Sequence, residues 1–206
     1  MNIFYCFAVI IVLFLERCRS ECTEERCDWR DEGAVTAAKD QTDCNVCWAF
    51  AAAAVGETFY KRNTGKPIQI LSEQFLMDCG HIYKKRLGRC VRHEGKVEGG
   101  DISEAFNVIK KIGLPNITTY GWAGRDKECP NIPEKDKYMW DLKFYARSYR
   151  DVSVDALKGY VRNNGLVAVL INPTPEWSKF KGGGIFSEPC DGTIEENLIH
   201  AVAIIG

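Results

Sequence analysis

Residues 41–60 read QTDCNVCWAFAAAAVGETFY, and this stretch decides how the rest of the chain is interpreted. From Val46 onward it is apolar on nearly every side of a helix, and its run of alanines strongly favours that conformation. A helix that is apolar all round is a buried one. Asp43 and Asn45 offer N-cap oxygens just before it. We therefore predict a buried central helix over residues 46–60, with Cys47 in its first turn.

Outward from this helix, cap and stop signals predict three further helices, over residues 73–77, 102–112 and 154–162. Ser72, Asp101 and Ser153 precede them as N-cap residues, and Asp101 with Glu104 three positions later resembles a capping box. Glycines at 113 and 165 are expected to end the second and third of these helices.

Two short apolar runs, Leu166–Ile171 and Ala201–Ile205, predict buried strands, and His200 leads the second. Residues 140–149 partly alternate and are a candidate third strand. Helices thus dominate the first half of the chain and strands the second, which predicts an α+β fold with no regular βαβ alternation.

The composition is that of an ordinary soluble globular protein. The 206 residues are 46 % hydrophobic and 27 % charged, with a formal net charge of −1. These values exclude a disordered chain, a collagen and a polytopic membrane protein, and they provide no basic field for nucleic acid. The apolar run Ile3–Leu15, followed by the small Ser20, predicts a secretory signal peptide over residues 1–20, with a short signal anchor as the alternative.

The cysteine content agrees with export, because ten cysteines are many for a cytosolic chain of this size. Two of them, Cys6 and Cys18, would leave with the signal peptide. An oxidising compartment would pair most of the remaining eight, which are Cys22, Cys27, Cys44, Cys47, Cys79, Cys90, Cys129 and Cys190. The open question is whether one of them stays reduced for chemistry.

Cys47 is the candidate for that chemistry, because a helix N-terminus and a neighbouring imidazolium both stabilise a thiolate. Of the three histidines, His81 and His93 lie in polar stretches and are expected at the surface. His200 opens an apolar strand; such a histidine is more often structural, but a nearby Cys47 reverses that preference. Gln41 could donate a hydrogen bond to a developing oxyanion, or it could be a solvent-facing loop residue.

These residues belong to a series of motifs through which the chain resembles the papain family of cysteine peptidases, which includes the lysosomal cathepsins. The collinear matches span about residues 27 to 206 and include Asp28-Trp29-Arg30, Gly33-Ala34-Val35-Thr36, Gln41, Cys44-Asn45-Val46-Cys47-Trp48-Ala49-Phe50, Leu71-Ser72-Glu73-Gln74, Asp78-Cys79, Gly99-Gly100, Gly182-Gly183-Gly184-Ile185-Phe186, His200-Ala201-Val202 and Gly206.

The resemblance implies a two-domain fold and a role for each matched residue. A helical domain over 21–130 would carry Cys47, a strand-rich partial barrel over 131–206 would carry His200, and substrate would bind in the cleft between them. Cys47 would attack the scissile carbonyl as a thiolate paired with the His200 imidazolium. The Gln41 side chain and the Cys47 backbone N–H would hold the oxyanion.

The resemblance also implies a peptide-binding surface. Gly99 and Gly100 would form a bare edge along which substrate backbone can lie. The S2 pocket maps onto Ile102, Leu170, Leu198, Ile199 and Ala201, all apolar, which implies a preference for a hydrophobic P2 residue. The implied partners are protein or peptide substrates and cystatin-like inhibitors, with no nucleic acid and no membrane once the signal is removed. The implied protein is a secreted or lysosomal monomer without a metal or organic cofactor.

Disulfides and a glycosylation site complete what the resemblance and the sequence imply. Cys79–Cys129 matches a usual family pair, and Cys90 is the expected partner of Cys44, because the usual partner position holds Val97. Cys22–Cys27 would be an extra local bridge, and these pairs leave Cys47 free. Asn116-Ile117-Thr118 is a glycosylation sequon, a candidate modification site in a secreted loop.

The chain departs from the family pattern in several places. The family's Asn-Ser-Trp-Gly motif and its long pro-segment are missing from these residues, so we expect a C-terminally truncated domain. Thr42-Asp43 and Asn45-Val46 replace the family's usual Gly-Ser pairs. These departures favour an alternative function, a catalytically inactive relative that serves as a binding or decoy protein. A redox Cys44-x-x-Cys47 site and a zinc site are weaker alternatives, because the βαβ context and the ligand spacing are missing.

Overall fold

The computed structural model describes residues 26–84, 87–90, 99–138, 152–187 and 199–206. Its longest helix is α2 (Cys47–Thr64), and its burial confirms the predicted central helix. The helix ends at Gly65, whose left-handed φ of 66° lets its N–H bond to the carbonyl of Lys61. The expected N-cap was wrong: the N-cap residue is Val46, and no side chain caps the first turn.

Three further helices follow the caps that the sequence predicts. They are α3 (Glu73–Tyr83), α4 (Ile102–Ile112) and α5 (Val154–Asn164), and they begin after Ser72, Asp101 and Ser153. Each of these cap side chains accepts a hydrogen bond from a backbone N–H in the first helical turn. Helix α3 runs six residues beyond the predicted Met77, so His81 lies in its last turn and not in a loop.

The strands form two small antiparallel sheets. In the larger one, β3 (Val167–Ile171) pairs with β4 (His200–Ile204), and the register places Ile171 opposite His200. In the smaller one, β1 (Leu114–Pro115) pairs with β2 (Lys137–Tyr138) after the 3-10 turn η1 (Glu134–Asp136). The short helix α6 (Pro175–Lys179) follows β3. The α+β prediction is confirmed, and the candidate strand at 140–149 lies outside the described residues.

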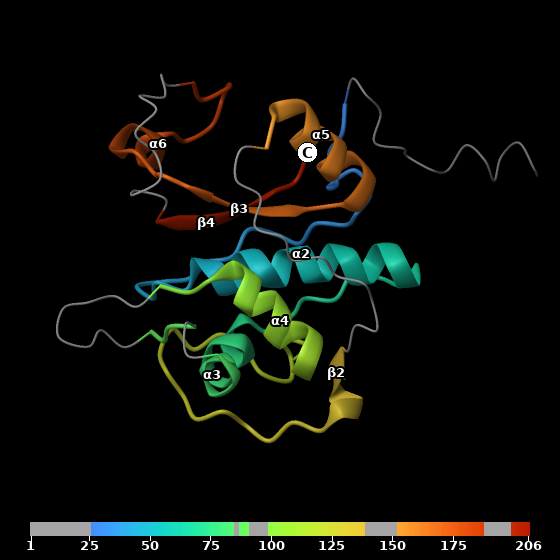
Figure 1. The fold of residues 1–206 in the computed structure, drawn as a ribbon, viewed down its shortest axis with the longest axis vertical. Coiled ribbons are helices and arrows are strands. Elements are labelled where there is room, and N and C mark those ends of the chain that lie inside the picture. Colours follow the sequence, from blue (N-terminus) through green and yellow to red (C-terminus); the bar gives the residue numbers. More distant parts are fainter. Residues whose placement is uncertain (1–25, 85–86, 91–98, 139–151, 188–198) are drawn as a thin grey trace, which may run out of the picture.

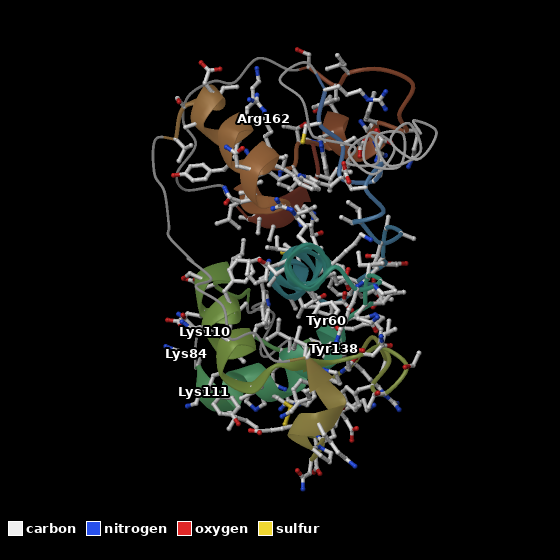
Figure 2. The ribbon with its side chains drawn as sticks, turned by 90° about the vertical axis from the view of Figure 1, so that its right-hand side faces the viewer. Tyr60, Lys84, Lys110, Lys111, Tyr138 and Arg162 are labelled. Carbon is white, nitrogen blue, oxygen red and sulfur yellow. A yellow bond between two sulfur atoms is a disulfide. The ribbon has the colours of Figure 1, made fainter. Side chains whose placement is uncertain are left out.

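Helix α2 lies between the two parts of the molecule (Figure 1). Helices α3 and α4 pack on one side of it, and the β3–β4 sheet with α5 lies on the other. Figure 2 shows α2 end-on between them. A first core fills the α3–α4 side and includes Trp48, Ala52, Leu76, Met77 and Val108. A second core fills the other side and includes Trp29, Ala34, Val55, Val161 and Leu166.

A buried ionic cluster joins α2, α3 and the N-terminal segment. Lys39 Nζ donates to Glu57 Oε1 at 2.6 Å and also to a carboxylate oxygen of Glu73. Thr36 Oγ1 and the N–H of Leu71 donate to the Glu57 carboxylate at 2.7 and 2.8 Å. Burial raises the pKa of Glu73, an effect that Lys39 only partly offsets. Burial alone would lower the pKa of Lys39, but the two carboxylates outweigh it and raise that pKa.

Two disulfides close long loops on the α3–α4 side of the molecule. Cys44 is bonded to Cys90 and Cys79 to Cys129, the two long-range pairings that the family resemblance implied. Cys27 is also disulfide-bonded, while its expected partner Cys22 lies outside the described residues. In the described part of the chain, no helix has the length and apolarity needed to cross a bilayer.

Candidate active site

Cys47 is the first residue of α2 and is half-buried. It is the one free cysteine among the described residues, since the others there are disulfide-bonded. Because no side chain caps the first turn of α2, the positive end of the helix is open toward the thiol. Cys47 therefore lies at the N-terminal end of the α2 dipole.

His200 is the first residue of β4 and is also half-buried. Helix α2 packs against β4, and both elements begin at the left of Figure 1. The Trp177 ring of α6 meets the His200 ring edge-on, with 6.0 Å between centroids. Burial lowers the pKa of His200 below its ordinary value, so this environment favours the neutral imidazole.

Gln41 lies in the tight turn that leads into α2, and its side chain is half-buried. Its carbonyl accepts hydrogen bonds from Thr42 Oγ1 at 2.7 Å and from the N–H of Cys44 at 3.3 Å. Cys44 is in turn fixed by its disulfide to Cys90. The Gln41 backbone is thus anchored six residues before Cys47.

The two glycines of the predicted substrate edge have different surroundings. A Cβ on Gly100 would lie 2.5 Å from Nε1 of Trp48, whose ring is fully buried next to Cys47. A Cβ on Gly99 would meet nothing within 4 Å. Gly99 therefore leaves open space, whereas Gly100 is required for close packing of the backbone on the indole.

Comparisons with known proteins identify the family of this chain. A sequence model described as papain family cysteine protease matches residues 23–206. The chain belongs to the papain family of cysteine proteases. It is 34 % identical over 183 residues to the senescence-specific cysteine protease SAG39 of Oryza sativa subsp. indica, and 32 % identical over 181 residues to cathepsin S of Mus musculus. Both alignments cover 87 % of this chain but only 48 % and 49 % of the relatives, so the chain spans about half of their length.

Solved structures confirm the papain-like fold. Digestive procathepsin L 3 of Tenebrio molitor superposes with a TM-score of 0.68 at 26 % identity, covering 87 % of this chain and 53 % of that one. Bromelain of Ananas comosus, solved in complex with the inhibitor E64, gives a TM-score of 0.66 at 29 % identity, covering 86 % and 73 %.

The residues that the papain-family resemblance assigned to the S2 pocket come from two elements, α4 and the β3–β4 sheet. Leu170 lies opposite Ala201 in the register, so these two share one sheet face while His200 occupies the other, and Ile199 lies just before β4. Ala201 is 5 % exposed, but Leu170 is 46 % and Ile199 is 72 % exposed. Ile102 begins α4 and packs partly against the first core. Leu198 lies outside the described residues.

The sequon residue Asn116 directly follows β1, which pairs with β2. A polar cavity of about 420 Å³ opens there, lined by Gln69, Asn116, Thr118, Thr119, Lys135, Asp136, Lys137 and Tyr138. Figure 2 shows Tyr138 next to Tyr60 of α2, and their rings meet edge-on with 4.9 Å between centroids.

The sequence analysis did not predict two features near the site, namely the contact of Trp177 with His200 and the backbone conformation of Thr42. The sequence does contain a signal for helix α6, which carries Trp177, because Thr174-Pro175 is typical of a helix start. In the structure, Thr174 Oγ1 accepts a hydrogen bond from the N–H of Trp177. Thr42 has a left-handed φ of 54°, which nothing about a threonine suggests. In the described ranges, no group of three or more His, Cys, Asp or Glu side chains converges as a metal site.

Proposed function

We propose that the protein is a secreted or lysosomal cysteine endopeptidase in which Cys47 is the nucleophile and His200 the general base and acid. The observation that carries the proposal is the free Cys47 thiol at the open start of a buried helix, which packs against the strand that begins at His200. Gln41, six residues earlier, is the proposed side-chain donor to the oxyanion.

Acylation begins when the His200 imidazole accepts the Cys47 proton, giving a thiolate–imidazolium pair. The thiolate forms a bond to the scissile carbonyl carbon, and the carbonyl π electrons move onto oxygen. The Gln41 carboxamide and the Cys47 N–H donate to that oxyanion. When the carbonyl re-forms, the C–N bond breaks and His200 donates its proton to the departing amine. A thioester on Cys47 remains.

Deacylation repeats these steps with water as the nucleophile. His200, now neutral, accepts a proton from the water as its oxygen bonds to the thioester carbon. The second oxyanion occupies the same donors and then collapses, breaking the C–S bond. The peptide acid leaves, and the Cys47–His200 pair is restored.

The test is covalent labelling with E64, whose epoxide a reactive thiolate opens. We expect one thioether bond, a mass increase of one inhibitor per chain, and a labelled peptide that contains Cys47. Cys47→Ser is the matched control and should take no label. A wild-type chain that stays unlabelled and hydrolyses no peptide would instead support the inactive binding relative.

A hydrophobic P2 preference is the finer part of the proposal. Leu170 and Ala201 share one face of the β3–β4 sheet, Ile199 lies just before β4, and all three side chains are apolar. We expect kcat/KM for a peptide with Leu at P2 to exceed that for Arg by about tenfold or more, because an uncompensated buried charge is costly. Equal rates would refute the assignment.

Export and glycosylation are proposed from the signal-like residues 1–20 and the sequon at Asn116. Asn116 Nδ2 donates to Gln69 Oε1 at 3.2 Å, and a glycosylated amide keeps one N–H for this bond. Expression through a eukaryotic secretory pathway should give a chain that loses mass on treatment with peptide N-glycosidase. Thr118→Ala should abolish that loss, and Thr119→Ala, which leaves the sequon intact, should not.

A further inference from the structure

The turn that carries Gln41 contains a backbone conformation that its sequence does not favour. Thr42, with a φ of 54°, is the only non-glycine residue with positive φ in the described part of the chain. In this left-handed region the Cβ of a β-branched residue crowds the neighbouring carbonyl oxygen. Such strain persists only when the surrounding structure holds it, so the contacts of Thr42 show what the turn is built to hold.

Those contacts fix the peptide unit between Gln41 and Thr42 at both of its polar atoms. The N–H of Thr42 donates to Asp40 Oδ1 at 2.7 Å. On the other side, the Gln41 carbonyl accepts from Thr42 Oγ1 at 2.7 Å and from the N–H of Cys44 at 3.3 Å. Three hydrogen bonds therefore hold the peptide unit that directly follows the Cα of Gln41.

The outer face of Thr42 rests on Gly124. A Cβ at Gly124, which itself has a φ of 63°, would lie 3.0 Å from Thr42 Oγ1. The two residues therefore meet closely, and a side chain at 124 would push Thr42 out of its place.

The segment around Gly124 is itself fastened to α3 by two fully buried polar side chains, Gln74 and Asp78. Gln74 accepts from the N–H of Ala123 and donates to the carbonyl of Arg125, both at 2.9 Å. Asp78 accepts from the N–H of Lys127 at 2.9 Å. The backbone behind Thr42 is thus held by a helix of the first core.

We propose that Thr42 is a positioning residue of the oxyanion site. Its left-handed backbone and its hydroxyl, supported from behind by Gly124, aim the Gln41 carboxamide at the reacting carbonyl. The inference rests on the proposed role of Gln41, and it assigns the buried Gln74–Asp78 pair as the support that α3 provides for this turn.

The main test is a double-mutant cycle on the full chain with Thr42→Gly and Gln41→Ala. Thr42→Gly restores the residue that the family usually has at this position and relieves the φ strain, but in this chain it removes the hydroxyl bond and the contact with Gly124. We expect Thr42→Gly to lower kcat for a peptide amide about tenfold with KM little changed, and Gln41→Ala to lower it about 10²- to 10³-fold. Adding Thr42→Gly to Gln41→Ala should cost nothing more, because Thr42 acts through Gln41.

Alkylation of Cys47 by iodoacetamide distinguishes a misplaced Gln41 carboxamide from a general disturbance of the site around Cys47. The thiolate displaces iodide at a saturated carbon, so no oxyanion forms, and the alkylation rate of Thr42→Gly should stay within about twofold of wild type. Thr119→Gly is the matched control, a threonine in an exposed turn, and should change neither rate. If Thr42→Gly does not fold, Thr42→Asn replaces it, since asparagine tolerates the left-handed backbone.

The possible results distinguish the inference from the function beneath it. Two results would overturn the role of Thr42 and leave the proposed function intact. One is that Thr42→Gly lowers kcat equally with Gln41 and with Ala at position 41. The other is that Thr42→Gly lowers the rates of hydrolysis and of alkylation in parallel. An active wild type in which Thr42→Gly is silent would do the same. A wild type that hydrolyses no peptide would overturn the proposed function, and the assignment of Thr42 with it.

Discussion

At the scale of single residues, the adjacent glycines 99 and 100 show how one motif serves two purposes. Gly100→Ala should destabilise the fold by about 2 kcal/mol, because the new Cβ would overlap the buried Trp48 ring, which has no room to move. Gly99→Ala is the matched control and should change the free energy of unfolding by less than about 0.5 kcal/mol, since open space surrounds that position. Urea unfolding of both variants checks this; equal costs would contradict it.

The titration of His200 provides a second prediction at this scale. In Cys47→Ala, burial alone acts on the ring, so the pKa of His200 should lie below 6.5. In the wild type, the negative charge of a Cys47 thiolate would favour the imidazolium and should raise the pKa of His200 relative to Cys47→Ala. NMR of the ring protons, assigned with His200→Asn, measures both. Because the folded-state pKa in Cys47→Ala is the lower one, that variant should lose stability as pH falls below 6.5.

At the scale of elements, the cap of α4 is a local feature with a measurable energy. Asp101 Oδ1 accepts from the N–H groups of Ser103 and Glu104 at 2.8 and 3.3 Å. Asp101→Ala should therefore lower the free energy of unfolding by about 1 kcal/mol, whereas Asp101→Asn, which keeps an acceptor oxygen, should cost only a few tenths. A similar loss in both variants would mean that the negative charge, and not the cap, stabilises the helix.

The elements also show what the sequence could and could not predict. The capped helices and the positions of strands β3 and β4 could be predicted, because caps, stops and periodicity are local signals. The predicted burial of these strands was wrong, since Ala201 is the one buried residue in the two. The end of α3 could not, because Asp78 and Gly80 favour a stop in isolation and only their burial continues the helix. The two-residue strands β1 and β2 are too short to show any alternation.

The candidate site likewise has features that local sequence signals predict and features that they do not. Residue types and spacing identify Gln41, Cys47 and His200 as candidates. The left-handed turn at Thr42 could not be predicted, because contacts with Asp40 and Gly124 hold it against its own preference. The edge-on contact of Trp177 with His200 likewise depends on where α6 packs, which no local pattern encodes.

At the scale of the whole molecule, the buried Lys39 cluster ties three parts of the chain together. Lys39→Met would leave the carboxylates of Glu57 and Glu73, both 1 % exposed, without their cation. We expect a loss of about 3 kcal/mol at pH 7, from the cost of unpaired buried charge. Lys66→Met, at an exposed lysine, is the matched control and should be nearly neutral.

The pH dependence of Lys39→Met checks the cause of that loss. Without Lys39, burial would hold the folded-state pKa of Glu73 above that of an unfolded glutamate, 4.5. Groups with a raised folded-state pKa stabilise the fold below the unfolded pKa, and they lose that contribution as pH rises through the folded one. The deficit should therefore shrink toward pH 4, as urea unfolding across pH would show. A pH-independent deficit would point to lost packing of the lysine stem.

The two long disulfides have a consequence for how the chain survives damage. The Cys44–Cys90 bridge spans 46 residues and the Cys79–Cys129 bridge spans 50, and the two spans overlap between 79 and 90. A single proteolytic nick anywhere from 44 to 129 therefore leaves both fragments covalently joined. On an electrophoresis gel, such a nicked molecule runs as one band until a reductant is added, and only then separates into two.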